Sequence, residues 1–279
     1  MTVLAFTIVV WLVSTLAGFL GALTGLGGGV VVVPVLALAL GVDIKYAIGA
    51  SLVSVIATSS GAAAAYVREG FSNIRIGLFL EMATTLGAIL GAYLATRTST
   101  HIIAMIFGVV LIQSALQSLT NKTPDNALLT ESDPLASRLR LGGTFPMEGQ
   151  RRKYGVRNVP AGLSMMFGAG TLSGLLGIGS GAVKVIAMDR AMKIPFKVST
   201  TTSNFMIGVT AAASAGVYLS RGYIDPRLAM PVMLGVLGGA LLGTRVLVHA
   251  RVRTLRIVFG LVILALAIEM IVNGFTGRI

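Results

Sequence analysis

The sequence predicts an all-α membrane protein that crosses the bilayer many times and is built from two inverted repeats. Of its 279 residues, 55% are hydrophobic and 11% are charged, whereas a soluble domain carries about 25% charged residues. Several apolar runs approach the length of about 20 residues that spans a bilayer. The chain also repeats itself, and a glycine cluster interrupts an apolar segment at the same place in each copy. Together these three observations predict the fold class.

Composition also limits the partners of the chain. It contains no cysteine, which excludes disulfides and thiolate metal sites. Its net charge of +12 could indicate a nucleic-acid partner, but the basic residues lie in loops beside apolar segments, where charge sets membrane topology. We therefore expect a lipid bilayer, and no nucleic acid, as the partner. The first apolar run, Val3 to Leu23, has no basic residue before it, unlike a cleaved signal peptide, so we expect it to be retained as a span.

A constant offset of 152 residues relates the two copies, and the match runs without a gap from Ala17 to Gln117. The matched pairs are Gly25/Gly177, Gly27/Gly179, Gly29/Gly181, Lys45/Lys197, Ser51/Ser203, Thr58/Thr210, Tyr66/Tyr218, Gly70/Gly222, Arg75/Arg227, Gly87/Gly239, Gly91/Gly243, Phe107/Phe259 and Gly108/Gly260. A repeat of this kind indicates a duplicated structural unit. We expect a first transmembrane repeat at residues 1–119, a linker at 120–158 and a second repeat at 159–279.

Each repeat is expected to hold about four spanning helices and one short, glycine-broken element. The first repeat gives Val3–Leu23, Val30–Leu40, Tyr46–Val67, Ile76–Ala95 and Ile102–Leu119. The second gives Pro160–Leu176, Ala182–Ala191, Phe196–Leu219, Leu228–Val248 and Leu255–Val272. The second element of each repeat is too short to span, because eleven helical residues rise only about 17 Å, half of the hydrocarbon core. It is expected to be a re-entrant or half helix.

The stretch between the repeats, Asn121 to Arg157, is polar, contains three prolines and carries mixed charge. This composition is typical of a linker loop that is partly disordered. We therefore expect this stretch to connect the two repeats as a loop.

The topology depends on whether the short element doubles back. If the broken segment crosses once, the repeats are parallel and Lys plus Arg divide 12 against 9 between the two sides. If it returns to its own side, the repeats are inverted and the division is 16 against 5, with Lys184 inside the membrane. The positive-inside rule favours the second arrangement. We therefore expect both termini outside the cell (inner) membrane and the linker loop in the cytoplasm.

The glycine clusters "GLGGGVVVVP" (25–34) and "GIGSGAVKVI" (177–186) mark a candidate binding site. A glycine-interrupted segment at matching positions of an inverted repeat is the sequence pointer to a transporter's site. Irregular backbone at that depth must be covered by protein or line a wet cavity. Helix N-termini carry free N–H groups and partial positive charge, so two that converge favour an anion. The expected donors are the backbone N–H groups of Gly27, Gly28, Gly29, Gly179, Ser180 and Gly181.

Lys184 lies two residues into the second short element. An ionisable residue inside the membrane is a functional hypothesis by default. The alternative is a lysine that snorkels to the interface, but the interface is far from the first turn of a helix that starts at the midplane. We expect Lys184 to help hold the anion. The matching residue of the first repeat is Val32, so the site would be asymmetric.

The third element of each repeat is rich in small polar residues. Ser51, Ser54 and Thr58 follow at i, i+3 and i+7, on one helical face. The second copy reads "STTTSNF" over 199–205. Hydroxyl and amide groups can donate to an oxyanion without carrying charge, and the alternative is close helix–helix packing. The candidate donors are Ser51, Thr202, Ser203 and Asn204.

Other small residues predict packing rather than chemistry. Thr58 belongs to this class, and so do the two small-xxx-small motifs. These motifs are Gly87-x-x-x-Gly91 and Gly239-x-x-x-Gly243. Each should lie where two helices approach closely.

Glu81 lies six residues into the span that begins at Arg75. It is a candidate proton relay, and the alternative is that its carboxylate reaches the cytoplasmic interface. Its position alone leaves both open.

Several signals of catalysis are absent from the sequence. The glycine clusters lack the spacing of a P-loop and the acidic residue of a dinucleotide fingerprint. The histidines, His101 and His249, stand at span ends, and no H-E-x-x-H motif occurs. The embedded residues provide no nucleophile–base–acid set. We expect no enzyme activity, cofactor or metal, and since no ATPase domain is present, a proton or ion gradient would drive uphill transport.

The order of these motifs resembles the sulfite exporter TauE/SafE family of membrane permeases. The resemblance rests on "GFLGALTGLGGGVVVVPVL" with "VDIKYAIGASLVSV", and on "GIGSGAVKV" with "KVSTTTSNF". It implies a multi-pass protein that moves sulfite, sulfoacetate or another small sulfur-containing anion. What it implies for single positions is limited to the glycine turns at 25–29 and 177–181 and the polar runs at 49–51 and 201–204.

The sequence and this resemblance together predict a secondary transporter, a permease or exporter of a small anion. Sulfite or an organosulfonate is the first choice, moved by alternating access of one repeat against the other. The alternatives are a passive anion channel, or a permease for another sulfur compound or an organic acid. The identity of the anion, the coupling ion and the oligomeric state are not predicted.

Overall fold

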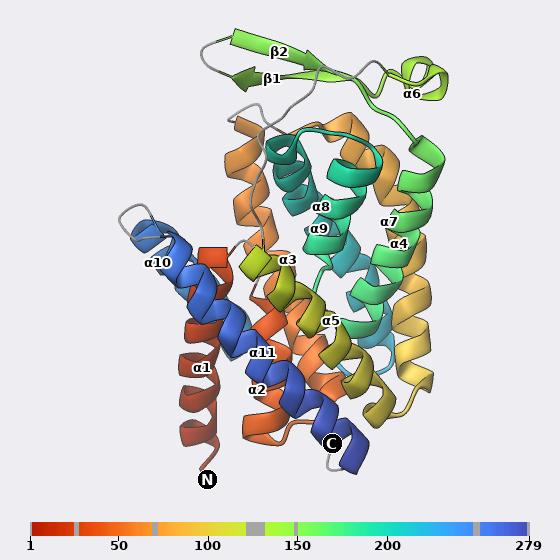
Figure 1. Ribbon diagram of the computed structural model, residues 1–279. Helices are drawn as coiled ribbons and strands as arrows, with labels where there is room; N and C mark the ends of the chain where they lie inside the picture. The colour runs from red at the N-terminus through yellow and green to blue at the C-terminus, as the bar shows by residue number, and fades with distance from the viewer. Residues whose placement is uncertain are drawn as a thin grey trace.

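The computed structural model describes residues 2–24, 28–68, 72–120, 132–147, 150–247 and 252–277 of the chain. It is a bundle of helices with a small hairpin at one end, and both termini lie at the other end (Figure 1). The first half forms α1 (Val3–Thr24), α2 (Gly29–Leu40), α3 (Ile44–Arg68), α4 (Ile74–Arg97) and α5 (Thr100–Thr120). The second forms α7 (Val159–Leu176), α8 (Gly181–Ile186) with its π-helical continuation η1 (Ala187–Ala191), α9 (Phe196–Ser220), α10 (Pro226–Leu247) and α11 (Val252–Thr276).

The helices confirm the predicted all-α polytopic class, and each lies within a few residues of its predicted range. In the described part of the chain, four helices are long and apolar enough to cross a membrane: α1, α4, α7 and α10. The short apolar helix α2 follows the first glycine cluster, and α8 with η1 follows the second. Each half therefore has one short helix directly after its glycine cluster, as the sequence predicted.

Helix pairing follows the repeat. In the first half α4 packs along α7 of the second, and in the second half α10 packs along α1 of the first. The third helices of the two halves, α3 and α9, pack together, as do the fifth, α5 and α11. Each contact thus has its counterpart under exchange of the halves. The inverted orientation of the repeats stays a prediction, which this pairing supports.

The small-xxx-small motifs lie at the tightest of these contacts. A Cβ added at Gly91 of α4 would lie 2.0 Å from the Thr171 carbonyl oxygen of α7. One added at Gly239 of α10 would lie 1.9 Å from the Thr15 carbonyl oxygen of α1. Gly87 meets the backbone of α7 equally closely. Their predicted packing role is confirmed, and that of Gly243 stays a prediction.

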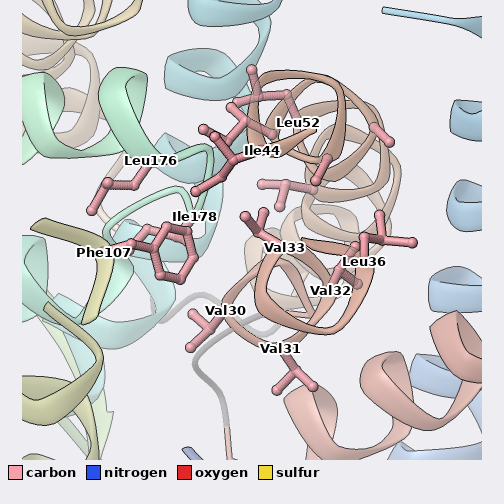
Figure 2. Packing of buried hydrophobic residues seen from close by; sticks show 14 of the residues in the cluster. Val30, Val31, Val32, Val33, Leu36, Ile44, Leu52, Phe107, Leu176 and Ile178 are labelled. Carbon is pink, nitrogen blue, oxygen red and sulfur yellow. The ribbon is translucent and has the colours of Figure 1, made fainter. Parts of the chain in front are cut away.

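The short helix α2 is buried along most of its length. Its four consecutive valines, Val30 to Val33, pack with Leu36 against Ile44 and Leu52 of α3, Phe107 of α5, and Leu176 and Ile178 (Figure 2). A helix that is apolar all round lies in a protein core or faces lipid, because it has no polar face for water. Here most of the helix is covered by protein from both halves.

Where the structure describes it, the predicted linker loop also contains regular secondary structure, which the sequence analysis did not identify. It forms α6 (Pro134–Arg138) and an antiparallel hairpin of β1 (Gly143–Met147) and β2 (Gln150–Tyr154), in which Gly143 pairs with Tyr154. The reason is a second apolar cluster, in which Leu141, Phe145 and Tyr154 pack with Ile76 of α4 and Met188 of η1.

One tyrosine anchors the hairpin to the bundle. The Asn73 side-chain amide donates to the Tyr154 hydroxyl at 2.7 Å. The side-chain oxygen of Asn73, Oδ1, caps α4 by accepting from the Ile76 backbone amide. Burial raises the pKa of the Tyr154 hydroxyl, which the Asn73 hydrogen bond only partly offsets. The linker therefore packs against α4 of the first half and η1 of the second.

Alanine substitutions in the α4–α7 contact should separate packing from helix propensity. Gly91→Ala should lower the thermal unfolding midpoint of the detergent-purified protein, because the new methyl group meets backbone that cannot move aside. Gly168→Ala is the matched control, since Gly168 of α7 has open space around it, and alanine favours a helix by about 1 kcal/mol over glycine. Equal midpoints for the two variants would contradict the packing described here.

Candidate functional site

The second glycine cluster forms a buried turn between α7 and α8. Gly177 and Gly179 have φ of +68° and +72°, and Ser180 has φ of +40°. Left-handed backbone of this kind costs little for glycine and more for serine. In compensation, the Ser180 hydroxyl donates a short hydrogen bond to the Ala169 carbonyl oxygen of α7. The sequence "GIGSG" thus lets the chain turn inside the bundle, as predicted.

Two repeat-related serines brace this turn. The Ser51 hydroxyl of α3 donates to the Gly177 carbonyl oxygen at 2.9 Å, and the Ser203 hydroxyl of α9 donates to the Gly181 carbonyl oxygen at 3.2 Å. Both serines were predicted to face an anion. In the structure their protons hold the backbone of the turn, and direct contact with an anion stays a prediction.

The first glycine cluster meets the second. A Cβ added at Gly29 would lie 2.6 Å from Ser51 Oγ and 3.2 Å from the Gly177 carbonyl oxygen. Gly28 caps α2 by accepting from the Val31 and Val32 amides. Gly27 lies outside the described residues. The structure therefore brings Gly29 to the second turn, whereas Gly28 lies against Val236 of α10 and Gly18 of α1, and the predicted convergence of both helix starts on an anion stays a prediction.

Thr202 and Asn204, the other polar candidates of α9, are less closely tied to this turn. The Thr202 hydroxyl accepts from the Asn73 backbone amide at 3.0 Å, which directs it toward the start of α4. Asn204 is partly exposed. Their predicted contact with an anion is not part of this geometry and stays a prediction.

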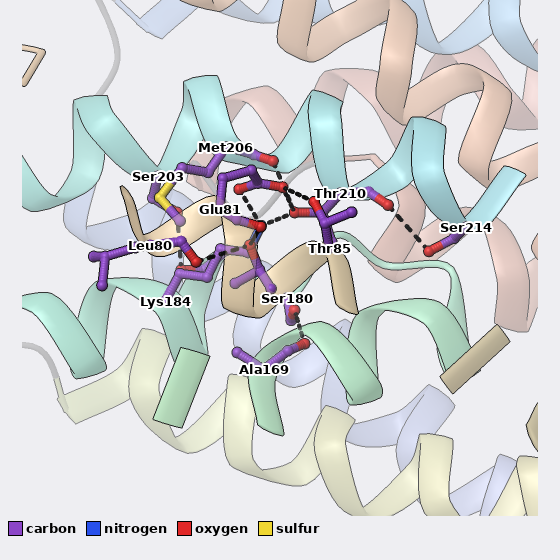
Figure 3. Close-up of polar contacts among 12 residues, drawn as sticks. Leu80, Glu81, Thr85, Ala169, Ser180, Lys184, Ser203, Met206, Thr210 and Ser214 are labelled. Carbon is purple, nitrogen blue, oxygen red and sulfur yellow. Dashed lines mark hydrogen bonds and ion pairs between the residues drawn. The ribbon is translucent and has the colours of Figure 1, made fainter. Parts of the chain in front are cut away.

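Lys184 lies one turn after Ser180 and is fully buried, with 0% of its surface exposed. Its Nζ donates to the Thr210 hydroxyl of α9 at 2.5 Å and lies 4.0 Å from Glu81 Oε2 of α4 (Figure 3). The lysine does not snorkel, because its ammonium group points into the bundle. Sequence analysis identified Lys184 as embedded but did not identify these partners.

Glu81 also points inward, with 4% of its surface exposed. Its Oε1 accepts from Thr210 at 2.5 Å and from Thr85 at 3.3 Å. Its Oε2 is buried and receives no hydrogen bond from the described residues. The alternative that this carboxylate reaches the cytoplasmic interface is therefore wrong.

Thr210 connects the two charges. Its hydroxyl oxygen accepts from Lys184, and its proton is directed to Glu81 Oε1 and to the Met206 carbonyl oxygen at 2.9 Å. We name Glu81, Thr210 and Lys184 the charge cluster. The repeat alignment had paired Thr210 with Thr58 and predicted packing for Thr58, whose hydroxyl indeed donates within its own helix to the Ser54 carbonyl oxygen.

The charge cluster contains residues of both halves, and the positions related to them by the repeat carry no charge. Glu81 comes from the first repeat, and Lys184 and Thr210 come from the second. The positions related by the offset of 152 residues are Met233, Val32 and Thr58. Two apolar residues, Met233 and Val32, therefore occupy the positions that correspond to the ion pair. The charge cluster is thus asymmetric between the repeats. Among the described residues, no group of three His, Cys, Asp or Glu side chains could hold a metal.

The sequence matches the family model described as sulfite exporter TauE/SafE over residues 10–270. It is 26% identical to the probable membrane transporter protein YunE of Bacillus subtilis, over 97% of this chain and 99% of that protein. It is 25% identical to YdhB of the same organism, over 85% of this chain and 87% of that protein. A probable membrane transporter protein of Xylella fastidiosa is 26% identical over 92% of this chain and 91% of its own length. No solved structure matches the chain significantly.

The charge cluster predicts a non-additive effect on stability. Glu81→Gln or Lys184→Met alone leaves one buried charge unpaired, which costs about 3–5 kcal/mol. Both single variants should therefore unfold at clearly lower temperature in detergent. The double variant should lose less than either single one, because it removes both charges together.

Glu269→Gln, at an exposed carboxylate, is the control and should leave the midpoint unchanged. Additive losses in the double variant would show that the two side chains do not stabilise each other.

Proposed function

Because the chain belongs to the sulfite exporter TauE/SafE family, we propose that it is a secondary transporter of a small anion, with sulfite or an organosulfonate as its first choice. These relatives are named probable membrane transporter proteins, and the similarity covers nearly their whole length. The proposal goes beyond these names in assigning an anionic substrate. The observation that carries it is the fully buried ammonium group of Lys184, one turn beyond a glycine turn in the interior of the bundle.

The backbone of the turn supports an anionic substrate. Among the described residues, the N–H groups of Gly179, Ser180 and Gly181 have no hydrogen-bond acceptor, although all three residues are buried. Buried N–H groups without acceptors cost free energy, which an oxyanion would recover by accepting from them. Lys184 would add a full positive charge. Ser51 and Ser203 would act by holding the turn in this conformation.

The arrangement of the two halves supports alternating access. The charge cluster connects α4 of the first repeat to α8 and α9 of the second, so relative motion of the repeats would change the site directly. Inverted repeats move in this way around a site near the membrane midplane. Both termini lie opposite the hairpin (Figure 1), in agreement with a cytoplasmic linker and external termini in a cell membrane.

The proposal is tested by uptake into proteoliposomes. The wild-type protein should take up labelled sulfite or an organosulfonate with saturation, and a gradient should drive the uptake. The double variant Lys184→Met/Glu81→Gln should reduce this uptake at least about tenfold, since a full charge interaction is lost. Lys197→Met, at an exposed lysine of α9, should retain wild-type uptake.

Other outcomes separate the alternatives. Flux that rises linearly with concentration and needs no gradient would indicate a passive channel. Uptake of an organic acid, with no sulfur compound moved, would identify a different substrate. If the double variant transports as well as the wild type, the buried lysine does not bind the anion.

A further inference from the structure

The charge cluster is electrically balanced before any substrate enters. Lys184 contributes one positive charge and Glu81 one negative charge, and the hydroxyl of Thr210 lies between them. An anion that binds to Lys184 would leave two negative charges against one positive charge. In a buried site an uncompensated charge costs several kcal/mol. Anion binding therefore costs little free energy only if another group in the site loses its negative charge.

Glu81 is the group able to lose that charge. Its Oε2 is buried, lies 4.0 Å from the Lys184 ammonium and receives no hydrogen bond from the described residues. It is therefore a free acceptor for a proton. Lys184 has only one strong hydrogen bond in the cluster, to Thr210, so its ammonium group keeps donors for a new partner.

The helices around Glu81 supply no competing charge. The helix α7, packed along α4, carries no ionisable side chain, and those of α9, Lys197 and Tyr218, lie near its two ends. On α8 and η1 the charged residues are Lys184 itself and then Asp189 and Arg190. On α4 itself, Arg75 and Arg97 lie near the two ends, and among the described residues Lys184 is the one cation within ion-pair distance of Glu81.

From this balance we infer that substrate anion and proton bind together. The anion replaces the Glu81 carboxylate as partner of Lys184, and a proton from water adds to Glu81 and forms a neutral carboxylic acid. Lys184 keeps its proton throughout. One proton therefore enters the site with each anionic charge bound to Lys184, which makes the protein a proton–anion symporter. This inference rests on the proposed anion transport.

A second consequence concerns the two repeats. In the free protein Lys184 is joined through Thr210 to Glu81, which fastens α8 and α9 to α4. A protonated Glu81 and an anion-bound lysine would no longer attract each other, so this link would loosen. Binding of both ligands would thus release this polar link between α4 and the α8–α9 region, whereas binding of one would not.

The test measures proton uptake on anion binding to the purified full-length protein. Methanesulfonate is the probe, since a sulfonate stays ionised around neutral pH and any proton taken up must belong to the protein. Titration calorimetry in buffers of different ionisation enthalpy should give close to one proton per anion for the wild type. The affinity should fall about tenfold for each unit by which the pH rises.

Glu81→Gln provides the decisive comparison. It should bind methanesulfonate with no proton uptake and with an affinity that is independent of pH. The anion should also restore the thermal stability that this variant lacks, which reports binding even if the variant is only marginally folded. Glu269→Gln should behave as the wild type. In the wild type alone, infrared difference spectra should show a new carboxylic acid carbonyl band on addition of the anion.

The outcomes distinguish this inference from the proposal beneath it. Binding of methanesulfonate or sulfite to the wild type without proton uptake would overturn the symport, and anion transport would stand. Proton uptake that persists in Glu81→Gln would place the proton on another group and would also overturn it. If no anion in a panel of sulfur oxyanions binds at all, the anion site and the symport fall together.

Discussion

The interaction on which the proposed transport depends is the ion pair of Lys184 and Glu81, buried in an apolar helix bundle. Lys184 and Glu81 are removed from water, and each is tolerated only because the other charge and the hydroxyl of Thr210 are present. The balance between desolvation and attraction in such pairs is close. A pair of this kind contributes little to stability and is therefore poorly explained as a packing device. Its position, one turn beyond a buried glycine turn and between the two halves, is better explained by a ligand that changes the balance.

The rest of the fold serves to bring this pair together. Glycines at the α4–α7 and α1–α10 contacts let the backbones approach closely, which fixes the depth and rotation of α4 and hence of Glu81. Left-handed backbone at Gly177, Gly179 and Ser180 lets α8 begin inside the bundle. Ser51 and Ser203 hold that turn from two sides. In the first half Val32 of α2 stands at the position of the lysine, so the short helix α2 carries no charge.

Much of the fold was predictable because membrane helices leave strong local signals. Apolar run length gave the spans, and the repeat with its glycine clusters gave the short helices and the embedded Lys184. The partnership of Lys184 with Glu81 was not predictable, since these residues lie on helices far apart in the sequence and meet only through the packing of α4 against α9. Thr210 was overlooked because its repeat mate Thr58 was assigned to helix packing. The hairpin was missed because its strands are short and β2 is mostly exposed and basic, and its apolar contacts come from distant helices.

The central claim is that the buried charge pair opens to admit an anion. The most direct measurement is an experimentally determined structure of the full-length protein in lipid with a bound organosulfonate. The account predicts the sulfonate oxygens within about 3 Å of Lys184 Nζ and of the turn amides, with Glu81 moved away from the lysine. A sulfonate bound elsewhere, beside an unchanged contact of Lys184 with Thr210 and Glu81, would contradict it.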